Sequence, residues 1–132
     1  MNILNEHGNA YAYRDLEARS LVNFLSLDLA LMGKELDHIW MDVEGCEYEI
    51  IEKLLLSGAF ARARLSVCQW NIEFHKYYDS MISNFTSKDF DQMMERIIGM
   101  EMLPLRLDFD WHLRAYFFNF ASPSCIAKYI DC

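Results

Sequence analysis

Long apolar runs, basic runs and closely paired cysteines are all missing from this 132-residue chain. No apolar stretch approaches the roughly 20 residues that a membrane-spanning helix needs, so we expect no membrane segment. Acidic residues outnumber basic ones by 20 to 12, and the formal net charge is −8. Binding to nucleic acid depends on clustered Lys and Arg side chains. The composition therefore argues against nucleic acid as a partner.

The four cysteines include no C-x-x-C pair, the spacing typical of zinc or redox sites. Cys46 and Cys68 lie in hydrophobic segments, where their simplest interpretation is that of small core residues. The first 15 residues have neither the basic flank nor the apolar run of a signal peptide. We therefore expect a soluble, cytoplasmic protein that needs no oxidising compartment.

No repeat, low-complexity tract or Pro/Gly/Ser-rich linker divides the sequence, so we predict one domain over residues 1–132. Hydrophobic periodicity predicts helices over residues 20–32, 47–56 and 87–98, and strands over residues 10–13, 37–42, 64–73, 102–109 and 114–121. The short turn at residues 110–112 predicts that the last two strands form an antiparallel hairpin.

Residues at the helix ends are of the types that start and stop helices. Ser20 and Ser87 are the expected N-caps, and Gly33, Gly58 and Gly99 are the expected stops. The larger aromatic side chains are expected in the core rather than around a cofactor; these are Trp70, Trp111 and residues 116–118.

The alternation of helices and strands predicts an α/β fold with a mostly parallel sheet that is covered on both faces. Ligands bind such sheets at the carboxyl ends of the strands. The residues expected at those ends are Asp42, Glu44, Gly45, Glu73 and His75.

Carboxylates at a strand end can orient an acceptor hydroxyl group and take up its proton. We prefer a ligand-contacting role for Asp42 and Glu44, because two carboxylates beside one glycine are costly without a ligand or partner. Gly45 allows a tight turn and a close approach of the backbone to a ligand. Glu47 comes in the first turn of the next helix, so stabilising that helix is its preferred role.

The roles of Glu73 and His75 stay open at this point. Glu73 either contacts the acceptor or pairs with a neighbouring cation, and His75 is either a base or a hydrogen-bonded structural residue. Asp42, Glu44, Glu73 and His75 also have the oxygen and imidazole groups that bind divalent cations. The spacing does not demand an ion, and we assign no metal.

Residues 39–47 (Ile-Trp-Met-Asp-Val-Glu-Gly-Cys-Glu) resemble the D-x-E-G-x-E signature of FkbM-type methyltransferases. The resemblance covers residues 16–121 and includes an E-x-H sequence after the next strand, here Glu73-Phe74-His75. It implies a Rossmann-like methyltransferase fold whose N-terminal strands are missing here. It also implies S-adenosylmethionine as cofactor, Asp42, Glu44, Glu73 and His75 as catalytic residues, and Gly45 as a cofactor contact.

The family's cofactor loop is a glycine-rich turn after the first strand, and Gly8 stands alone in this part of the chain. We therefore expect the acceptor-side half of an O-methyltransferase for a small-molecule or glycan-like hydroxyl acceptor. Alone, this half should be inactive and should not bind the cofactor. The alternative is a non-catalytic, truncated methyltransferase-like interaction module that self-associates through an open sheet edge.

Overall fold

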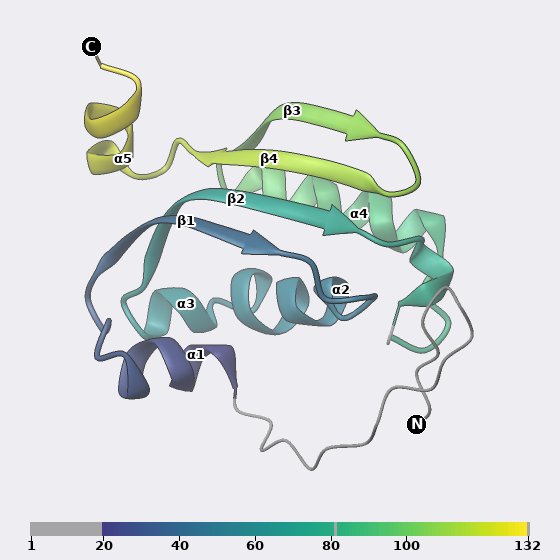
Figure 1. Ribbon diagram of the computed structural model, residues 1–132, viewed down its shortest axis with the longest axis horizontal. Coiled ribbons are helices and arrows are strands. Elements are labelled where there is room, and N and C mark those ends of the chain that lie inside the picture. The colour runs from purple at the N-terminus through teal and green to yellow at the C-terminus, as the bar shows by residue number, and fades with distance from the viewer. Residues whose placement is uncertain (1–19, 81, 132) are drawn as a thin grey trace.

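Four strands form one open sheet in the order β1–β2–β4–β3 (Figure 1). In this computed structural model the strands are β1 Glu35–Met41, β2 Ser66–Phe74, β3 Met102–Phe109 and β4 Leu113–Asn119. The helical segments are α1 Leu21–Asn23, η1 Phe24–Asp28, α2 Glu47–Ile50, η2 Ile51–Leu56, α3 Ala59–Arg62, η3 Tyr77–Asp79, α4 Ser87–Gly99 and α5 Pro123–Tyr129. The structure describes residues 20–80 and 82–131, and the strand expected over residues 10–13 lies outside them.

The strand pairings confirm two predictions and correct a third. β1 and β2 are adjacent and parallel, with Met41 beside Ile72, and β3 and β4 form the antiparallel hairpin. The expectation of a mostly parallel sheet is wrong for the described strands, because β4 pairs with β2 in the antiparallel direction. The short turn after β3 sends the chain back beside β2, so the sheet mixes both kinds of pairing.

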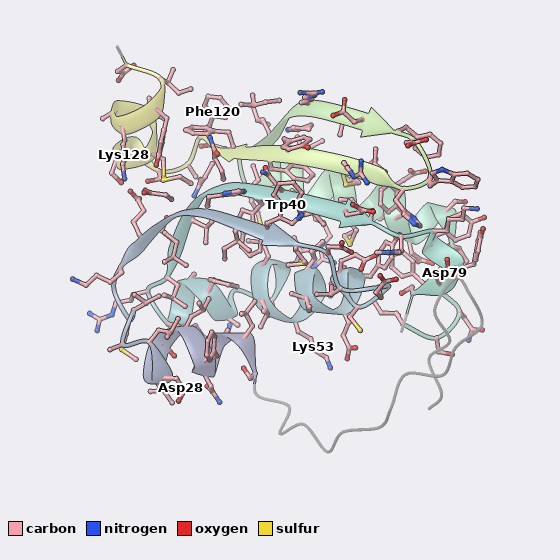
Figure 2. All side chains as sticks on the ribbon, in the orientation of Figure 1. Asp28, Trp40, Lys53, Asp79, Phe120 and Lys128 are labelled. Carbon is pink, nitrogen blue, oxygen red and sulfur yellow. A yellow bond between two sulfur atoms is a disulfide. The ribbon has the colours of Figure 1, made fainter. Side chains whose placement is uncertain are left out.

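Helices α2 to α4 pack on one face of the sheet and enclose the larger of two hydrophobic clusters in the described part of the chain (Figure 1). Its most deeply buried side chains are Tyr48, Ile51, Met93, Ile97 and Phe117. The predicted helix cover on both faces is wrong for most of the described sheet, because Trp40 of β1 remains 62% exposed (Figure 2). A sheet with antiparallel pairs can leave one face to water. Trp70 is buried as predicted, whereas Trp111 is exposed.

The first helix is shorter than its hydrophobic periodicity predicts. The Ser20 side chain caps it as predicted, but η1 ends at Asp28, and Ala30 then adopts a left-handed conformation with φ 52°. The chain therefore turns before Met32 and Gly33 are reached. Within residues 20–80 and 82–131, no helix has the length and apolar character to cross a bilayer.

The third predicted helix, α4, has different end residues from those expected. Thr86, not Ser87, is its N-cap: the Thr86 hydroxyl accepts from the Asp89 amide, and the Asp89 carboxylate accepts from the Thr86 amide at 2.8 Å. This reciprocal capping box satisfies two amides that the helix itself leaves unpaired. Gly99 belongs to the last turn, and Glu101 takes the left-handed conformation with φ 60°.

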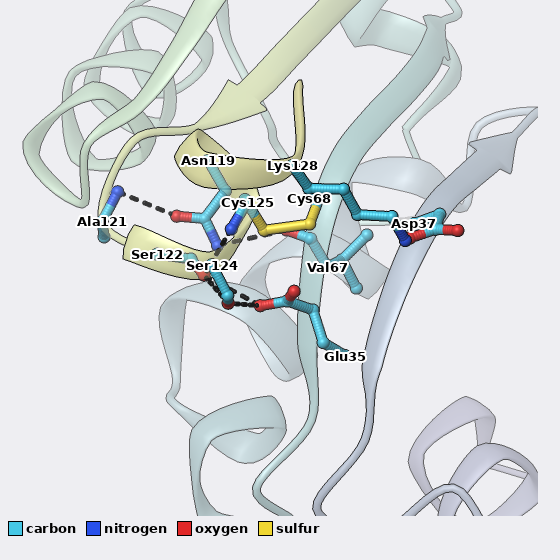
Figure 3. The surroundings of a disulfide bond; sticks show 10 residues. All are labelled: Glu35, Asp37, Val67, Cys68, Asn119, Ala121, Ser122, Ser124, Cys125 and Lys128. Atoms are coloured by element: carbon cyan, nitrogen blue, oxygen red, sulfur yellow. Dashed lines mark hydrogen bonds and ion pairs between the residues drawn. A yellow bond between two sulfur atoms is a disulfide. The ribbon is translucent and has the colours of Figure 1, made fainter. Parts of the chain in front are cut away.

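Helix α5, which the periodicity did not reveal, is attached to the amino-terminal ends of β1 and β2 (Figure 3). A disulfide joins Cys68 of β2 to Cys125 of α5, so the prediction that Cys68 is a simple core thiol is wrong. The Ser122 and Ser124 hydroxyls donate to the Glu35 carboxylate at 2.8 and 2.6 Å. Structural disulfides are typical of oxidising compartments, whereas the sequence led us to expect a reducing one.

Reduction of the Cys68–Cys125 disulfide should lower the free energy of unfolding by about 2–4 kcal/mol. The linked residues are 57 positions apart, and closing a loop of that length restricts the unfolded chain. Urea unfolding with and without reductant measures the change. Cys125→Ser should show the same loss and no further response to reductant. If reductant leaves the urea midpoint of the wild-type chain unchanged, the prediction is wrong.

Candidate functional site

The polar residues predicted at the strand ends gather at one edge of the sheet. Asp42 and Glu44 follow β1, while Glu73 and His75 come from the end of β2. Because β1 and β2 are parallel, their carboxyl ends meet at the same edge. Asp79 of η3 marks this edge in Figure 2, beyond the points of both arrows. We call Asp42, Glu44 and His75 the strand-end cluster.

The loop after β1 owes its shape to two successive left-handed residues. Glu44 has φ 52° and Gly45 has φ 95°, and such conformations disfavour side chains with a Cβ. A Cβ on Gly45 would lie 2.4 Å from the backbone oxygen of Asp79. Gly45 therefore allows the close backbone approach that the sequence predicts, and the group it meets in this structure is Asp79.

Glu47, fully buried at the start of α2, ties the loop to the end of β2. Its carboxylate accepts hydrogen bonds from the backbone amides of Gly45 at 2.9 Å and His75 at 2.7 Å. The same carboxylate lies 3.2 Å from Nδ1 of the His75 ring. Glu47 therefore has a structural role, but its contacts join the loop to β2 and do not stabilise its own helix in the way that the sequence predicts.

His75 is the central side chain of the strand-end cluster and is only 8% exposed. Its Nε2 atom lies 3.3 Å from Oε2 of Glu44 and 3.9 Å from Oδ1 of Asp42. The backbone oxygen of His75 accepts a hydrogen bond from the Tyr48 hydroxyl. Burial raises the pKa of Tyr48, with the nearby Glu47 and Asp79 carboxylates adding to the effect, so this phenol stays protonated and remains a donor.

Glu73 pairs with Arg114 of the neighbouring strand β4. Arg114 Nε donates to Oε2 of Glu73 at 2.8 Å, and this hydrogen bond is the main reason why the pKa of Glu73 lies below its usual value. Of the two roles that the sequence left open for Glu73, the structure therefore shows the contact with a neighbouring cation.

His112, which the sequence analysis placed only in a turn, lies against His75. The two ring centroids are 4.3 Å apart, and Nδ1 of His112 is buried without a hydrogen-bond partner among the described residues. The sequence could not reveal this contact, because it depends on the pairing of β2 with β4. Glu73 lies opposite Arg114 in this pairing, which places the turn of the hairpin beside the end of β2. The sequence predicted the hairpin but not this neighbour.

A cavity of about 340 Å³ lies between η2 and α4. Its lining includes Glu52, Phe85 and Arg96 and none of the strand-end cluster. Arg96 and Glu52 form an ion pair there at 2.8 Å. Asp89, which also lines the cavity, is held by Thr86 in the capping box of α4.

The fold and the polar edge together are typical of α/β enzymes that bind their ligands where parallel strands end. The profile of the Methyltransferase FkbM domain matches residues 3–109 of the chain. The protein therefore belongs to the FkbM methyltransferase family, which confirms the resemblance of residues 39–47. No curated protein and no solved structure matches the chain.

Gly45→Ala should lower the free energy of unfolding by about 2–3 kcal/mol. The left-handed conformation costs an L-residue about 1–2 kcal/mol, and the new Cβ would also collide with the Asp79 backbone. Gly33→Ala is a matched control, because Gly33 has φ 74° but no atom within 4 Å of the position that a Cβ would take. Urea unfolding of both variants tests this prediction. If both variants lose the same free energy of unfolding, the collision with the Asp79 backbone does not add to the cost of the left-handed conformation.

The Glu73–Arg114 pair should stabilise the fold only where Glu73 is ionised. Its folded pKa is depressed, so the contribution is present above the unfolded value near 4.5 and is lost as the pH falls through the folded value. Glu73→Gln should therefore cost about 1 kcal/mol at pH 7 and clearly less at pH 3. The urea concentration at the unfolding midpoint, measured for the wild type and the variant at both pH values, tests this prediction. A loss of stability that is equal at both pH values would contradict the role assigned to the Glu73–Arg114 pair.

Proposed function

We propose that the protein is an S-adenosylmethionine-dependent methyltransferase acting on a hydroxyl group of a small-molecule or glycan-like acceptor. The observation that carries this proposal is the gathering of Asp42, Glu44 and His75 where β1 and β2 end. Sheets of this kind bind ligands at that edge, and the family supplies the reaction class.

We assign the strand-end cluster to the acceptor side of the reaction. Asp42 is half-exposed and can accept a hydrogen bond from an incoming hydroxyl group. The acceptor oxygen would take the methyl group from the sulfonium of the cofactor, which would leave as a neutral thioether. The proton of the acceptor O–H group would pass to the cluster or to water. Glu44 adds a second negative charge that favours loss of this proton from the acceptor into the cluster.

Arg114 lowers the pKa of Glu73, which makes Glu73 a poorer proton acceptor than an unpaired glutamate. We assign it to contacts that position the acceptor, together with the Arg114 guanidinium beside it. His75 holds the cluster together, since its ring faces Asp42 and Glu44 while its other nitrogen faces Glu47.

The described residues do not fit the nucleoside part of S-adenosylmethionine. Gly45 already has its open side filled by the Asp79 carbonyl. Within residues 20–80 and 82–131, no strand precedes β1 that could end in a carboxylate for the ribose. We therefore assign this part of the chain to the acceptor and Gly45 to the turn.

Asp42→Asn tests the proposal in a fusion of this chain to the cofactor-binding strands of another FkbM methyltransferase. We expect kcat/KM for a hydroxyl acceptor to fall by about 10²–10⁴-fold, while the Kd for S-adenosylmethionine stays within twofold. Methyl transfer from labelled cofactor and calorimetric titration measure the two quantities. Glu49→Gln is the control, because Glu49 is an exposed carboxylate of α2 that pairs with Lys53.

Two results would count against the proposed function. Equal losses of methyl transfer and cofactor affinity in Asp42→Asn would place Asp42 at the cofactor. Methylation confined to nitrogen or carbon acceptors would contradict a hydroxyl substrate.

The second candidate function is a non-catalytic interaction module. It is favoured by the position of β1, which lies at the edge of the described sheet and pairs there only with β2. An open strand edge can pair with a second copy of the chain or with a partner. A stable dimer on a sizing column, with a fusion that transfers no methyl group, would favour this function over the first.

A further inference from the structure

We propose that Asp42, Glu44 and His75 bind a divalent cation, with His75 Nε2 and one oxygen of each carboxylate as ligands. This inference deepens the proposed function and rests on it only for the use of the ion, which would hold the acceptor oxygen. Binding itself is a property of the chain's own residues. Ligand atoms of all three side chains lie within 4.8 Å of one another.

The hydrogen-bonding groups of His75 are the first reason to place a cation here. Nδ1 faces the buried Glu47 carboxylate, which can only accept a hydrogen bond, so the proton of a neutral imidazole belongs on Nδ1. Nε2 then presents a lone pair to Glu44 and Asp42, which are also acceptors. Three acceptors that face one another repel unless a positive charge lies between them.

The second reason is that the described part of the chain offers the two carboxylates no partner besides His75. Among the described residues, Asp42 and Glu44 form no hydrogen bond or ion pair except with His75. The left-handed backbone of Glu44 brings its side chain to His75 at a conformational cost. A ligand that both carboxylates share would explain why the loop keeps this shape.

The distances also suit shared coordination. Ligand atoms about 2.1 Å from an ion lie about 3.0–3.4 Å apart at octahedral to tetrahedral angles. The separation of 3.3 Å between Nε2 and Glu44 falls in this range. The separation of 3.9 Å to Asp42 needs a small rotation of a half-exposed side chain.

Glu47 completes the arrangement as a positioning residue. A carboxylate that accepts from the distal nitrogen of a ligating histidine fixes the tautomer and raises the basicity of the coordinating nitrogen. Glu47 is fully buried and is itself held by two backbone amides, so the His75 ring cannot turn freely. His75 is thus aimed at the cluster before any ion arrives.

A second triad shares His75 and includes Glu73 and His112. Glu73 already accepts from Arg114 at 2.8 Å, and this guanidinium would compete with an ion for the same carboxylate. The exposed carboxylates of Asp42 and Glu44 have no such competitor among the described residues, and they leave coordination positions open to water or an acceptor oxygen. The first triad is therefore the better site.

The ligand set identifies the class of ion. One imidazole with two carboxylates suits a first-row transition metal such as Mn²⁺ better than Mg²⁺ or Ca²⁺, which prefer oxygen alone. Mn²⁺ should therefore bind more tightly than Mg²⁺. The open positions would let the bound ion hold an acceptor hydroxyl and lower its pKa.

Calorimetric titration of the chelator-treated full chain with MnCl₂, without cofactor or acceptor, tests the site. We expect saturable binding of about one ion per chain. Glu44→Gln and His75→Asn should each weaken it at least about 10-fold, while Glu49→Gln stays within twofold. Circular dichroism shows which variants remain folded, and the 82% exposed Glu44 side chain can be changed without disturbing the core.

Three outcomes would overturn the site. If the intact chain takes up no Mn²⁺, the three side chains do not form a cation site. Binding that is unchanged in folded Glu44→Gln would place the ion elsewhere. Binding lost in His112→Asn but kept in Glu44→Gln would identify the other triad. None of these outcomes depends on methyl transfer, so the site and the proposed function can fail independently.

Discussion

The buried carboxylate of Glu47 connects every part of the candidate site. Placing a carboxylate in a protein interior costs several kcal/mol unless hydrogen bonds compensate it. Here two backbone amides, from Gly45 and His75, approach within 3 Å. The first amide belongs to the loop after β1 and the second to the end of β2. One side chain therefore fixes how two loops meet at the edge of the sheet, and the His75 ring takes its orientation from the same carboxylate.

The neighbouring contacts make this arrangement rigid. Gly45 can present its amide to Glu47 only in a left-handed turn that packs against Asp79. The Tyr48 hydroxyl, next in sequence, holds the backbone oxygen of His75 while its ring packs among Phe74, Phe85 and Phe90. The polar network is thus attached directly to the hydrophobic core. Loss of core packing near Tyr48 would loosen the site as well as the fold.

Local patterns in the sequence were enough to predict the strands β1 to β4 and the parallel pairing of β1 with β2. They could not predict which strand lies beside β2 on the other side, because that depends on contacts between residues far apart in the chain. For the same reason His112 was missed as a neighbour of His75. The disulfide was missed because Cys68 and Cys125 are 57 positions apart, and no spacing rule pairs them. At α4, Thr86 and Ser87 are both good caps, and the carboxylate of Asp89 selects the first.

The side chains of the candidate site become more exposed from the core toward the solvent. Glu47 and His75 are buried, Asp42 is half-exposed, and Glu44 is 82% exposed. Side chains that must keep one geometry are therefore inside, where packing and hydrogen bonds restrict them. Those that would meet an ion or an acceptor face water and can adjust by rotation at little cost. A ligand can reach the cluster without opening the core, because the buried His75 ring already presents Nε2 to the exposed carboxylates. The loop after β1 thus presents its charges to solvent while the fold behind it stays closed.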